Sequence, residues 1–181
     1  PFDARTIRVL LMDTGFKNLF HKKAELELNC DARLVCKNDD GDSKESTLKK
    51  GEVLTLTAED ERLKHGRMTI IPEKEEGITI CSLERAQGQP VYSGSLEIKK
   101  EEEGLVLINE LYLEDYLKKV VPSEMPASYE KEALKTQAVC ARTYAYRQIQ
   151  GNTYGAYGAH VDDSTSFQVY NNTQTNERTD Q

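Results

Sequence analysis

The sequence predicts an α+β protein in which a β-rich N-terminal lobe is followed by a helical hairpin. From Ile7 to about Ile108, short apolar or alternating runs are separated by polar turns, which is typical of strands. After Tyr112 the apolar residues recur at helical spacing instead. Since 181 residues are enough for two such parts, we expect a β-rich lobe over residues 1–108 and a helical region from 109 to 181.

Seven runs in the first part predict strands, and "NDDGD", "KEEG" and "QGQP" mark turns between them. Many short strands with turns at this spacing indicate a small barrel or a sandwich. The runs are "IRVLLM", "AELELN", "RLVCKN", "EVLTLTA", "RMTIIP", "GITICSL" and "SGSLEIKK".

Two helices are predicted next. "LVLIN" is still a strand, but the pattern after it predicts a helix that begins near Leu113 and ends before Pro122, because the residue before a proline resists the α conformation. A second helix is expected from Ser128, a favourable N-cap residue. Its narrow stripe of mostly small residues would let another backbone approach closely, and consists of Leu134, Ala138, Ala141 and Ala145.

The last part of the sequence predicts a loop, "GNTYGAYGAHVDDSTSF", then a short strand, "FQVYNN", and a disordered polar tail, "TQTNERTDQ". A chain that stops just after a strand begins suggests truncation at the C-terminus. The start at Pro1, without Met, suggests the same at the N-terminus. No run reaches the roughly 20 apolar residues of a membrane span.

Charge and cysteine content narrow the function classes. Acidic residues outnumber basic ones by 31 to 24, so nucleic acid is not an expected partner. The four cysteines, Cys30, Cys36, Cys81 and Cys140, form no pair with zinc-ligand spacing. Cys30 and Cys36 could meet across a hairpin, or each cysteine could pack as a small hydrophobe.

Glu124 stands between Pro122 and Pro126, in the turn predicted between the two helices. Prolines on both sides stiffen the backbone, which suits a side chain that must be aimed into a cleft. Partial burial near Val121 and Met125 would raise the pKa of a carboxyl group and favour a general acid. Taken alone, the position of the residue favours a capping or helix-dipole role over catalysis.

The stretch that contains Glu124 resembles the stage II sporulation protein D and amidase-enhancer family. The resemblance rests on "VVPSEMP", "EALKTQAV" and "ARTYA", in that order, and more loosely on "TIRVLL" and "YSGSLEI" upstream. It implies a lytic transglycosylase that cleaves peptidoglycan glycan strands stripped of their peptides and leaves 1,6-anhydromuramic ends, in sporulation and engulfment. Glu124 would be the single catalytic acid/base. Asp115 and Asp163 are reserve carboxylates, each expected as a solvated surface charge.

The resemblance also implies that four further residues contact the substrate: Ser123, Lys135, Gln137 and Arg142. For Arg142 we infer a role in binding the lactyl carboxylate of a muramic acid without peptide. An ion pair with a nearby glutamate, such as Glu124 itself, is the alternative. For Lys135, the residue type and its helical position favour a surface charge. Tyr144 and Tyr146 could stack on a sugar or belong to the core, and Cys140 is expected to pack.

Some members of the family bind zinc near a "CTDSTHCQ"-like segment. This chain has "VDDSTSFQ" there, with Val161 and Phe167 at the two cysteine positions. Neither side chain can ligate a metal, and His160 stands alone, so we expect no zinc and no other cofactor.

Two rival functions remain open. A non-catalytic wall-binding protein could hold glycan and modulate an amidase, or the β lobe could be a scaffold in the engulfment machinery. The resemblance implies peptidoglycan glycan strands as partner, and a cell-wall amidase of the engulfment complex with stage II sporulation proteins P and M. It also implies an extracytoplasmic protein, anchored in the membrane by an N-terminal segment missing from this sequence.

Overall fold

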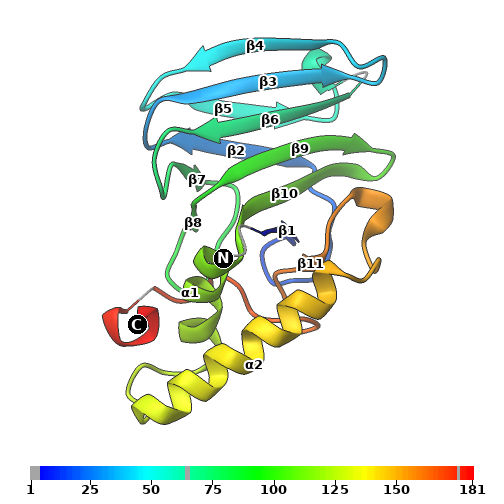
Figure 1. The fold of residues 1–181 in the computed structure, drawn as a ribbon. Coiled ribbons are helices and arrows are strands. Elements are labelled where there is room, and N and C mark those ends of the chain that lie inside the picture. Colours follow the sequence, from blue (N-terminus) through cyan, green and yellow to red (C-terminus); the bar gives the residue numbers. More distant parts are fainter. Residues whose placement is uncertain (1–4, 64–65, 175) are drawn as a thin grey trace.

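The computed structural model describes residues 5–63, 66–174 and 176–181. Figure 1 shows two layers of strands, with the long helix α2 crossing below them and the shorter α1 between. The predicted α+β class, with a β-rich first part and helices later, is confirmed. The boundary predicted after residue 108 falls inside a strand, so the division into two parts stays a prediction.

The strands form two sheets. Neighbours are antiparallel except for β1 and β11, which run parallel. The larger sheet has the order β11 (Val161–Asp162), β1 (Thr6–Leu10), β10 (Gly104–Tyr112), β9 (Ser95–Glu101), β6 (Gly66–Pro72), β3 (Ala32–Asn38) and β4 (Ser43–Leu48). The smaller sheet has the order β5 (Val53–Thr57), β2 (Lys23–Leu28), β7 (Ile78–Ile80) and β8 (Val91–Tyr92).

All seven strands predicted from the first part of the chain are confirmed. Three strands were missed, because their sequences lack the signal on which the prediction relied. In β4 only Leu48 is buried, so no alternation of apolar and polar residues is visible. β8 and β11 are two residues long, too short to show any period.

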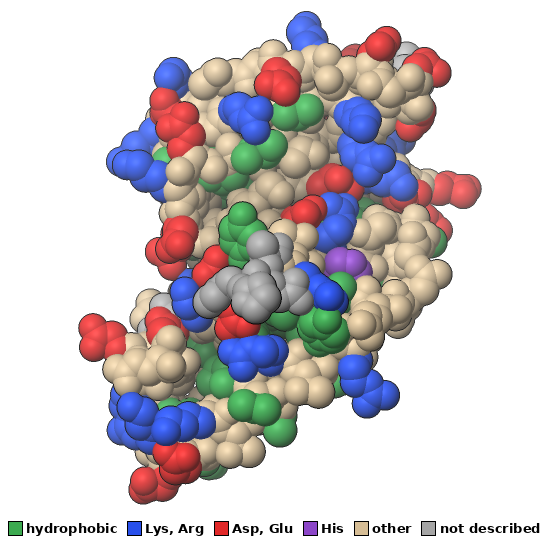
Figure 2. Space-filling view, in the orientation of Figure 1, with side chains coloured by type: hydrophobic (Ala, Val, Ile, Leu, Met, Phe, Trp, Pro, Cys, Tyr) green, Lys and Arg blue, Asp and Glu red, His purple; other side chains and the backbone are tan. Residues whose placement is uncertain are grey.

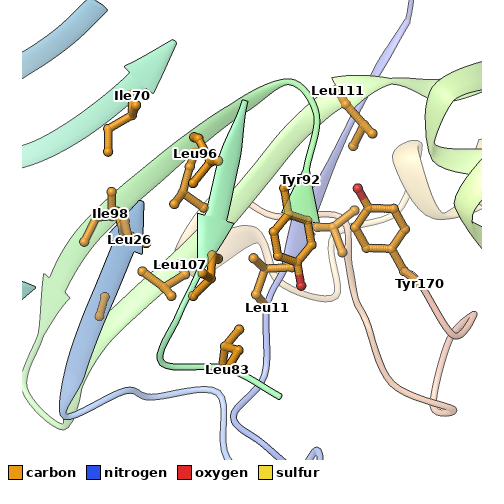
Figure 3. Packing of buried hydrophobic residues seen from close by; sticks show 14 of the residues in the cluster. Leu11, Leu26, Ile70, Leu83, Tyr92, Leu96, Ile98, Leu107, Leu111 and Tyr170 are labelled. Atoms are coloured by element: carbon orange, nitrogen blue, oxygen red, sulfur yellow. The ribbon is translucent and has the colours of Figure 1, made fainter. Parts of the chain in front are cut away.

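The core lies between the two sheets. Leu26 of β2 packs within one hydrophobic cluster with Ile98 of β9 and Leu107 of β10, and all three are fully buried. Figure 3 shows these side chains together, with Tyr92 and Tyr170 beside them. Each fully buried Leu or Ile stabilises the fold by roughly 1.5–3 kcal/mol. The cluster therefore makes the two sheets a rigid support for the helices.

Helix α1 (Leu113–Glu124) begins at the predicted residue but ends later than predicted. Pro122 lies inside the helix, because its ring is buried and its missing N–H frees only the carbonyl of the exposed Lys118. The restriction on residues before a proline acts at Pro126 instead: Met125 is extended, with φ −140° and ψ 124°. Glu124 is consequently the last helical residue, rather than part of the connecting turn.

Helix α2 (Lys131–Ile149) is the predicted second helix, but it begins three residues after Ser128, so the prediction of Ser128 as its N-cap is wrong. The amide of Tyr129 donates to the carbonyl of Pro126 and closes a turn, and Ser128 lies within this turn, before the helix begins. Glu130 is the N-cap residue. The predicted small-residue stripe is confirmed, since Leu134, Ala141 and Ala145 are buried.

The C-terminal predictions need two corrections. Residues 167–172 form no strand; their backbone amides bond instead to Glu124, to Asp163 and to the carbonyl of Lys119. The tail was expected to be disordered, but it contains a short helix, α3 (Glu177–Asp180), capped by the side chain of Asn176. Two 3-10 turns, η1 (Glu61–Leu63) and η2 (Gly155–Tyr157), complete the elements.

The cysteines are free. Cys30 is buried, while Cys36 and Cys81 are partly buried, in keeping with the small-hydrophobe interpretation. Cys36 lies within β3 opposite Met68, so it does not face Cys30 across a hairpin. Cys140 is exposed, which contradicts its expected role in packing.

Asp163 and Arg85 form a buried ion pair that joins the C-terminal part of the chain to the β-rich part. Their side chains are 0% and 1% exposed, and Nη2 of Arg85 lies 2.6 Å from Oδ2 of Asp163. The amide of Met12 donates to Oδ1 of Asp163, and Nη2 of Arg85 also donates to the Met12 carbonyl. Burial raises the pKa of Asp163 to about 6, against the opposing charge of Arg85. The expectation of a solvated surface charge at Asp163 is therefore wrong.

We predict that Asp163→Asn lowers the free energy of unfolding by about 3–5 kcal/mol, because it leaves the Arg85 charge buried without a counter-ion. Urea denaturation followed by circular dichroism measures the change. Asp115→Asn is the matched control: Asp115 forms a surface pair with Lys118, so this change should stay within about 0.5 kcal/mol. Equal effects of the two substitutions would contradict the assigned role of the buried pair.

Candidate functional site

Glu124 ends helix α1 with an exposed side chain. The expected partial burial near Val121 and Met125 is therefore not found at the carboxyl group. Its Oε1 accepts a hydrogen bond of 2.6 Å from the backbone amide of Val169. This bond fixes one carboxyl oxygen and leaves Oε2 available to a ligand.

The amide donor belongs to a segment, residues 163–172, that we call the strap. It lies against both helices of the hairpin through Gln168, which is 7% exposed. Oε1 of Gln168 accepts from the hydroxyl of Tyr116 on α1 at 3.4 Å, and its Nε2 donates to the carbonyl of Ala141 on α2 at 3.3 Å. These two bonds of Gln168 therefore fix the position of the neighbouring residue, Val169, beside the C-terminal end of α1.

Tyr170 anchors the strap to the sheets. Its ring stacks on Tyr116 with centroids 5.0 Å apart, and its hydroxyl donates to Oδ1 of Asn109 in β10 at 2.7 Å. Figure 3 shows the ring entering the core beside Tyr92. The strap is thus tied down at Asp163, Gln168 and Tyr170, and sequence reasoning assigned none of these anchoring roles. The signal was present only as polar and aromatic residues in a segment interpreted as loop and strand.

Ser123, the residue before Glu124, also forms a hydrogen bond with the strap. Its hydroxyl donates to the carbonyl of Lys119 at 2.7 Å and accepts from the amide of Asn172 at 3.2 Å. Both of its hydrogen-bonding functions are therefore used within the protein. This arrangement supports a positioning role for Ser123 next to Glu124.

Arg142 and Lys135 lie together, but away from Glu124. Both line a groove of about 390 Å³ between α1, α2 and α3, and Glu124 is not among its lining residues. Arg142 donates through Nε and Nη2 to the carboxylate of Glu114, at 2.8 and 2.7 Å. The guanidinium lowers the pKa of Glu114. The expected ion pair therefore exists, with Glu114 rather than Glu124 as its partner. Figure 2 shows basic and hydrophobic side chains side by side over this end of the molecule.

Gln137 occupies a different flank of α2. At 3.6 residues per turn it stands about 200° around the helix from Lys135, so the two side chains leave on opposite sides of the buried stripe. Tyr144 is two turns further along on the side of Gln137, and nearby Asp162 contributes to raising its pKa, after desolvation. Tyr146 is half-buried against the core, where the guanidinium of Arg5 lies 4.3 Å from its ring centroid. A core role is therefore favoured for Tyr146.

In the segment for which we predicted no zinc site, "VDDSTSFQ" and the preceding His160, polar side chains form hydrogen bonds within the protein. Asp162 accepts from the hydroxyls of Tyr154 and Ser164, at 2.6 Å each. Nδ1 of His160 accepts from the backbone amide of Arg8, and burial lowers the pKa of the imidazole. Among residues 5–63, 66–174 and 176–181, no three His, Cys, Asp or Glu residues are grouped so that they could hold a metal.

The fold and the site together define an α+β protein that presents an exposed glutamate from a helical hairpin beside a strap. Comparison with known proteins identifies the family. Residues 101–181 match the family model described as stage II sporulation protein, SpoIID. This part of the chain, which contains the hairpin and the strap, therefore belongs to the SpoIID family.

Three relatives extend this result. An uncharacterised protein of Brachyspira hyodysenteriae is 40% identical over 102 residues, 56% of this chain and 26% of the relative. Stage II sporulation protein D of Bacillus subtilis is 45% identical over 65 residues, 35% of this chain and 19% of the relative. The amidase enhancer of Bacillus subtilis is 45% identical over 69 residues, 36% of this chain and 9% of the relative. The matches thus span about a quarter or less of these relatives. No solved structure matches the chain significantly.

We predict that Gln168→Ala lowers the free energy of unfolding by about 1–3 kcal/mol, because it removes the partner of the buried Tyr116 hydroxyl. The same variant should exchange the amide hydrogen of Val169 faster, since the neighbouring residue of the strap loses its hydrogen bonds to Tyr116 of α1 and Ala141 of α2. Denaturation and hydrogen exchange by NMR measure the two effects. Gln150→Ala, at an exposed position after α2, is the control and should change neither. Unaltered exchange at Val169 in Gln168→Ala would contradict the anchoring role.

Proposed function

We propose that the protein containing this chain is a peptidoglycan lytic transglycosylase that cleaves peptide-free glycan strands, in sporulation or engulfment. The observation that carries the proposal is the carboxyl group of Glu124, which is exposed and held through one oxygen by the amide of Val169. Membership of the SpoIID family and the sporulation protein of Bacillus subtilis support the setting.

A single carboxyl group is sufficient for this reaction. Glu124 donates its proton to the bridging oxygen as the bond from the muramic acid anomeric carbon to that oxygen breaks. The 6-hydroxyl of the same muramic acid then attacks the anomeric carbon, and its proton passes to the Glu124 carboxylate. One C–O bond forms as one breaks, no water is consumed, and the acid is regenerated. Glycosidases that use water or a covalent intermediate need a second carboxylate, whereas here the nucleophile is tethered to the sugar.

The free oxygen of Glu124 suits this role. Oε1 is occupied by the Val169 amide, so Oε2 is the atom that would carry the proton. Ser123 and the strap hold the backbone on either side. An acid/base aimed by fixed neighbours loses little entropy when the substrate binds.

Arg142 and Lys135 are proposed to bind an anionic group of the strand in the groove beside α3. The Arg142–Glu114 pair has side chains that are 44% and 40% exposed, and surface pairs of this kind contribute only about 0–1 kcal/mol. A ligand carboxylate can therefore compete with Glu114 for the guanidinium fork. Because the groove excludes Glu124, the strand would have to reach around the hairpin to contact both. Gln137 is proposed as a substrate contact on the opposite flank.

A non-catalytic function is the second candidate. One relative is named an amidase enhancer, so the chain could hold glycan and promote the activity of a cell-wall amidase without cleaving it. In either case we propose an extracytoplasmic location, membrane anchoring outside this sequence, and an amidase of the engulfment complex as partner. Within the described residues, no helix is both long and apolar enough to span a bilayer.

We predict that the complete gene product forms 1,6-anhydromuramic ends from peptide-free glycan strands, and that Glu124→Gln reduces their formation at least about 100-fold, the typical contribution of a general acid. Glutamine can still accept the Val169 amide bond, so the fold should be unchanged. Mass spectrometry of the products measures the effect. Glu130→Gln, at the exposed N-cap of α2, is the control and should retain full activity. Strand binding without new ends in either the wild type or the variant would favour the amidase enhancer instead.

We predict that Arg142→Ala weakens binding of peptide-free strands about tenfold, since one charge-assisted contact contributes roughly 1.5–3 kcal/mol. The same change should affect peptide-bearing strands less, because their lactyl carboxylate is in an amide bond. Sedimentation binding assays on the two kinds of strand give the comparison. Arg147→Ala, an exposed arginine in the last turn of the same helix, controls for loss of positive charge. Equal losses for Arg142→Ala and Arg147→Ala would indicate a non-specific charge effect.

A further inference from the structure

A pocket of about 340 Å³ lies where the β-rich part meets helix α1. One wall is the loop of residues 85–91, between β7 and β8; the other is the end of the strap with the residues that follow it. Lys119 of α1 and Glu76 complete the lining. Its volume falls within the range of small-ligand sites.

The two walls are fixed to each other. The amide of Ala86 donates to Oδ1 of Asn172 at 2.9 Å, and Nδ2 of Asn171 donates to the carbonyl of Val91 at 2.8 Å. Arg85, at the start of the loop, is locked by its buried pair with Asp163. The pocket is therefore pre-formed, and a ligand would not need to order its walls.

The charged groups around the pocket already have partners. Nζ of Lys119 lies 2.9 Å from the carboxylate of Glu76, and Arg85 is paired with Asp163. The remaining polar lining is uncharged: the side-chain amides of Gln87, Gln89, Asn171 and Gln174, with the hydroxyl of Thr173. An amide offers both donors and an acceptor, as does each hydroxyl of a sugar. A neutral ligand dense in hydroxyl and amide groups matches this lining better than an anion does.

The pocket is also close to Glu124 along two paths. Lys119 precedes Glu124 by five residues on α1, which is about 7.5 Å along the helix axis and about 140° around it. Along the strap, Asn171 follows Val169, the amide partner of Glu124, by two residues, at most about 7 Å. A glycan strand whose scissile bond lies at Glu124 can therefore place a neighbouring sugar in the pocket.

We propose that this pocket, which we call the amide pocket (residues 85–91, 171, 173 and 174 with Glu76 and Lys119), is a subsite for a neutral N-acetylated sugar of the strand. The inference rests on the proposed function, because it takes the strand at Glu124 as its starting point. It assigns recognition of the uncharged sugar to Gln87 and Gln174, one exposed side-chain amide from each wall. Neither residue touches the acid/base, so the subsite acts on binding and not on proton transfer.

The test uses the complete gene product and the β-1,4-linked trisaccharide of N-acetylglucosamine, followed by NMR. We expect the sugar to shift the amide signals of residues 85–91 and 171–174. The double variant Gln87→Ala/Gln174→Ala should bind it at least about tenfold more weakly, which corresponds to about 1.4 kcal/mol or one to two hydrogen bonds. Gln150→Ala should bind as the wild type does.

Three results would overturn the subsite. These are an absence of shifts at these residues, unchanged affinity in the double variant, and binding of the acidic peptide Ala-Glu-Ala there in place of the sugar. None of them depends on cleavage. The test on Glu124→Gln can therefore fail while sugar binding succeeds, or the reverse, and the two proposals are distinguished.

Discussion

The buried pair between Arg85 and Asp163 is the interaction on which the rest of the site depends. Arg85 comes from the loop after β7, whereas Asp163 follows β11, 78 residues later. Two charges without water are costly unless each is paired and hydrogen-bonded. Here the backbone of Met12 bonds to both side chains, and the carbonyls of Asp13 and Glu84 accept from Nη1 of Arg85. The pair therefore fixes the start of the strap, at Asp163, next to the edge strand β11 of the larger sheet. From that fixed point the strap reaches Glu124 through Gln168 and Val169.

The strap converts a surface glutamate into an aimed one. The last residue of a helix with an exposed side chain would otherwise sample several rotamers. The Val169 amide selects one of them, and Tyr170 and Gln168 prevent that amide from moving. The aromatic stacking and hydrogen bonds of the strap thus connect the packed core to one carboxyl oxygen, Oε1 of Glu124. The same segment, a few residues later, forms a wall of the amide pocket, so one element positions both.

Much of the fold could be predicted because it depends on local patterns. Alternation in "AELELN" and helical spacing after Tyr112 each reflect burial of one face, and both predictions are confirmed. The predictions were wrong where tertiary contacts, rather than local sequence, determine the structure. The pre-proline rule holds at Met125 but is overridden at Val121, because burial of Pro122 outweighs one lost hydrogen bond. Asp163 carries no sign in the sequence that its partner stands at Arg85, so its burial could not be foreseen.

The sequence motifs supplied candidate site residues, which remain a prediction, but they did not indicate the geometry of those residues. Glu124, Ser123, Gln137, Lys135 and Arg142 come from neighbouring motifs, and a helical hairpin suggests that they converge. Helical periodicity instead sends Lys135 and Arg142 to the flank beside α3 and Gln137 to the other. The strand that we propose at Glu124 would therefore have two further contacts, an amide-lined pocket of paired charges and a basic groove, neither of which Glu124 itself lines. A neutral sugar and an acidic one alternate in the strand that we propose as substrate, so two surfaces of different charge would fix its register as well as hold it.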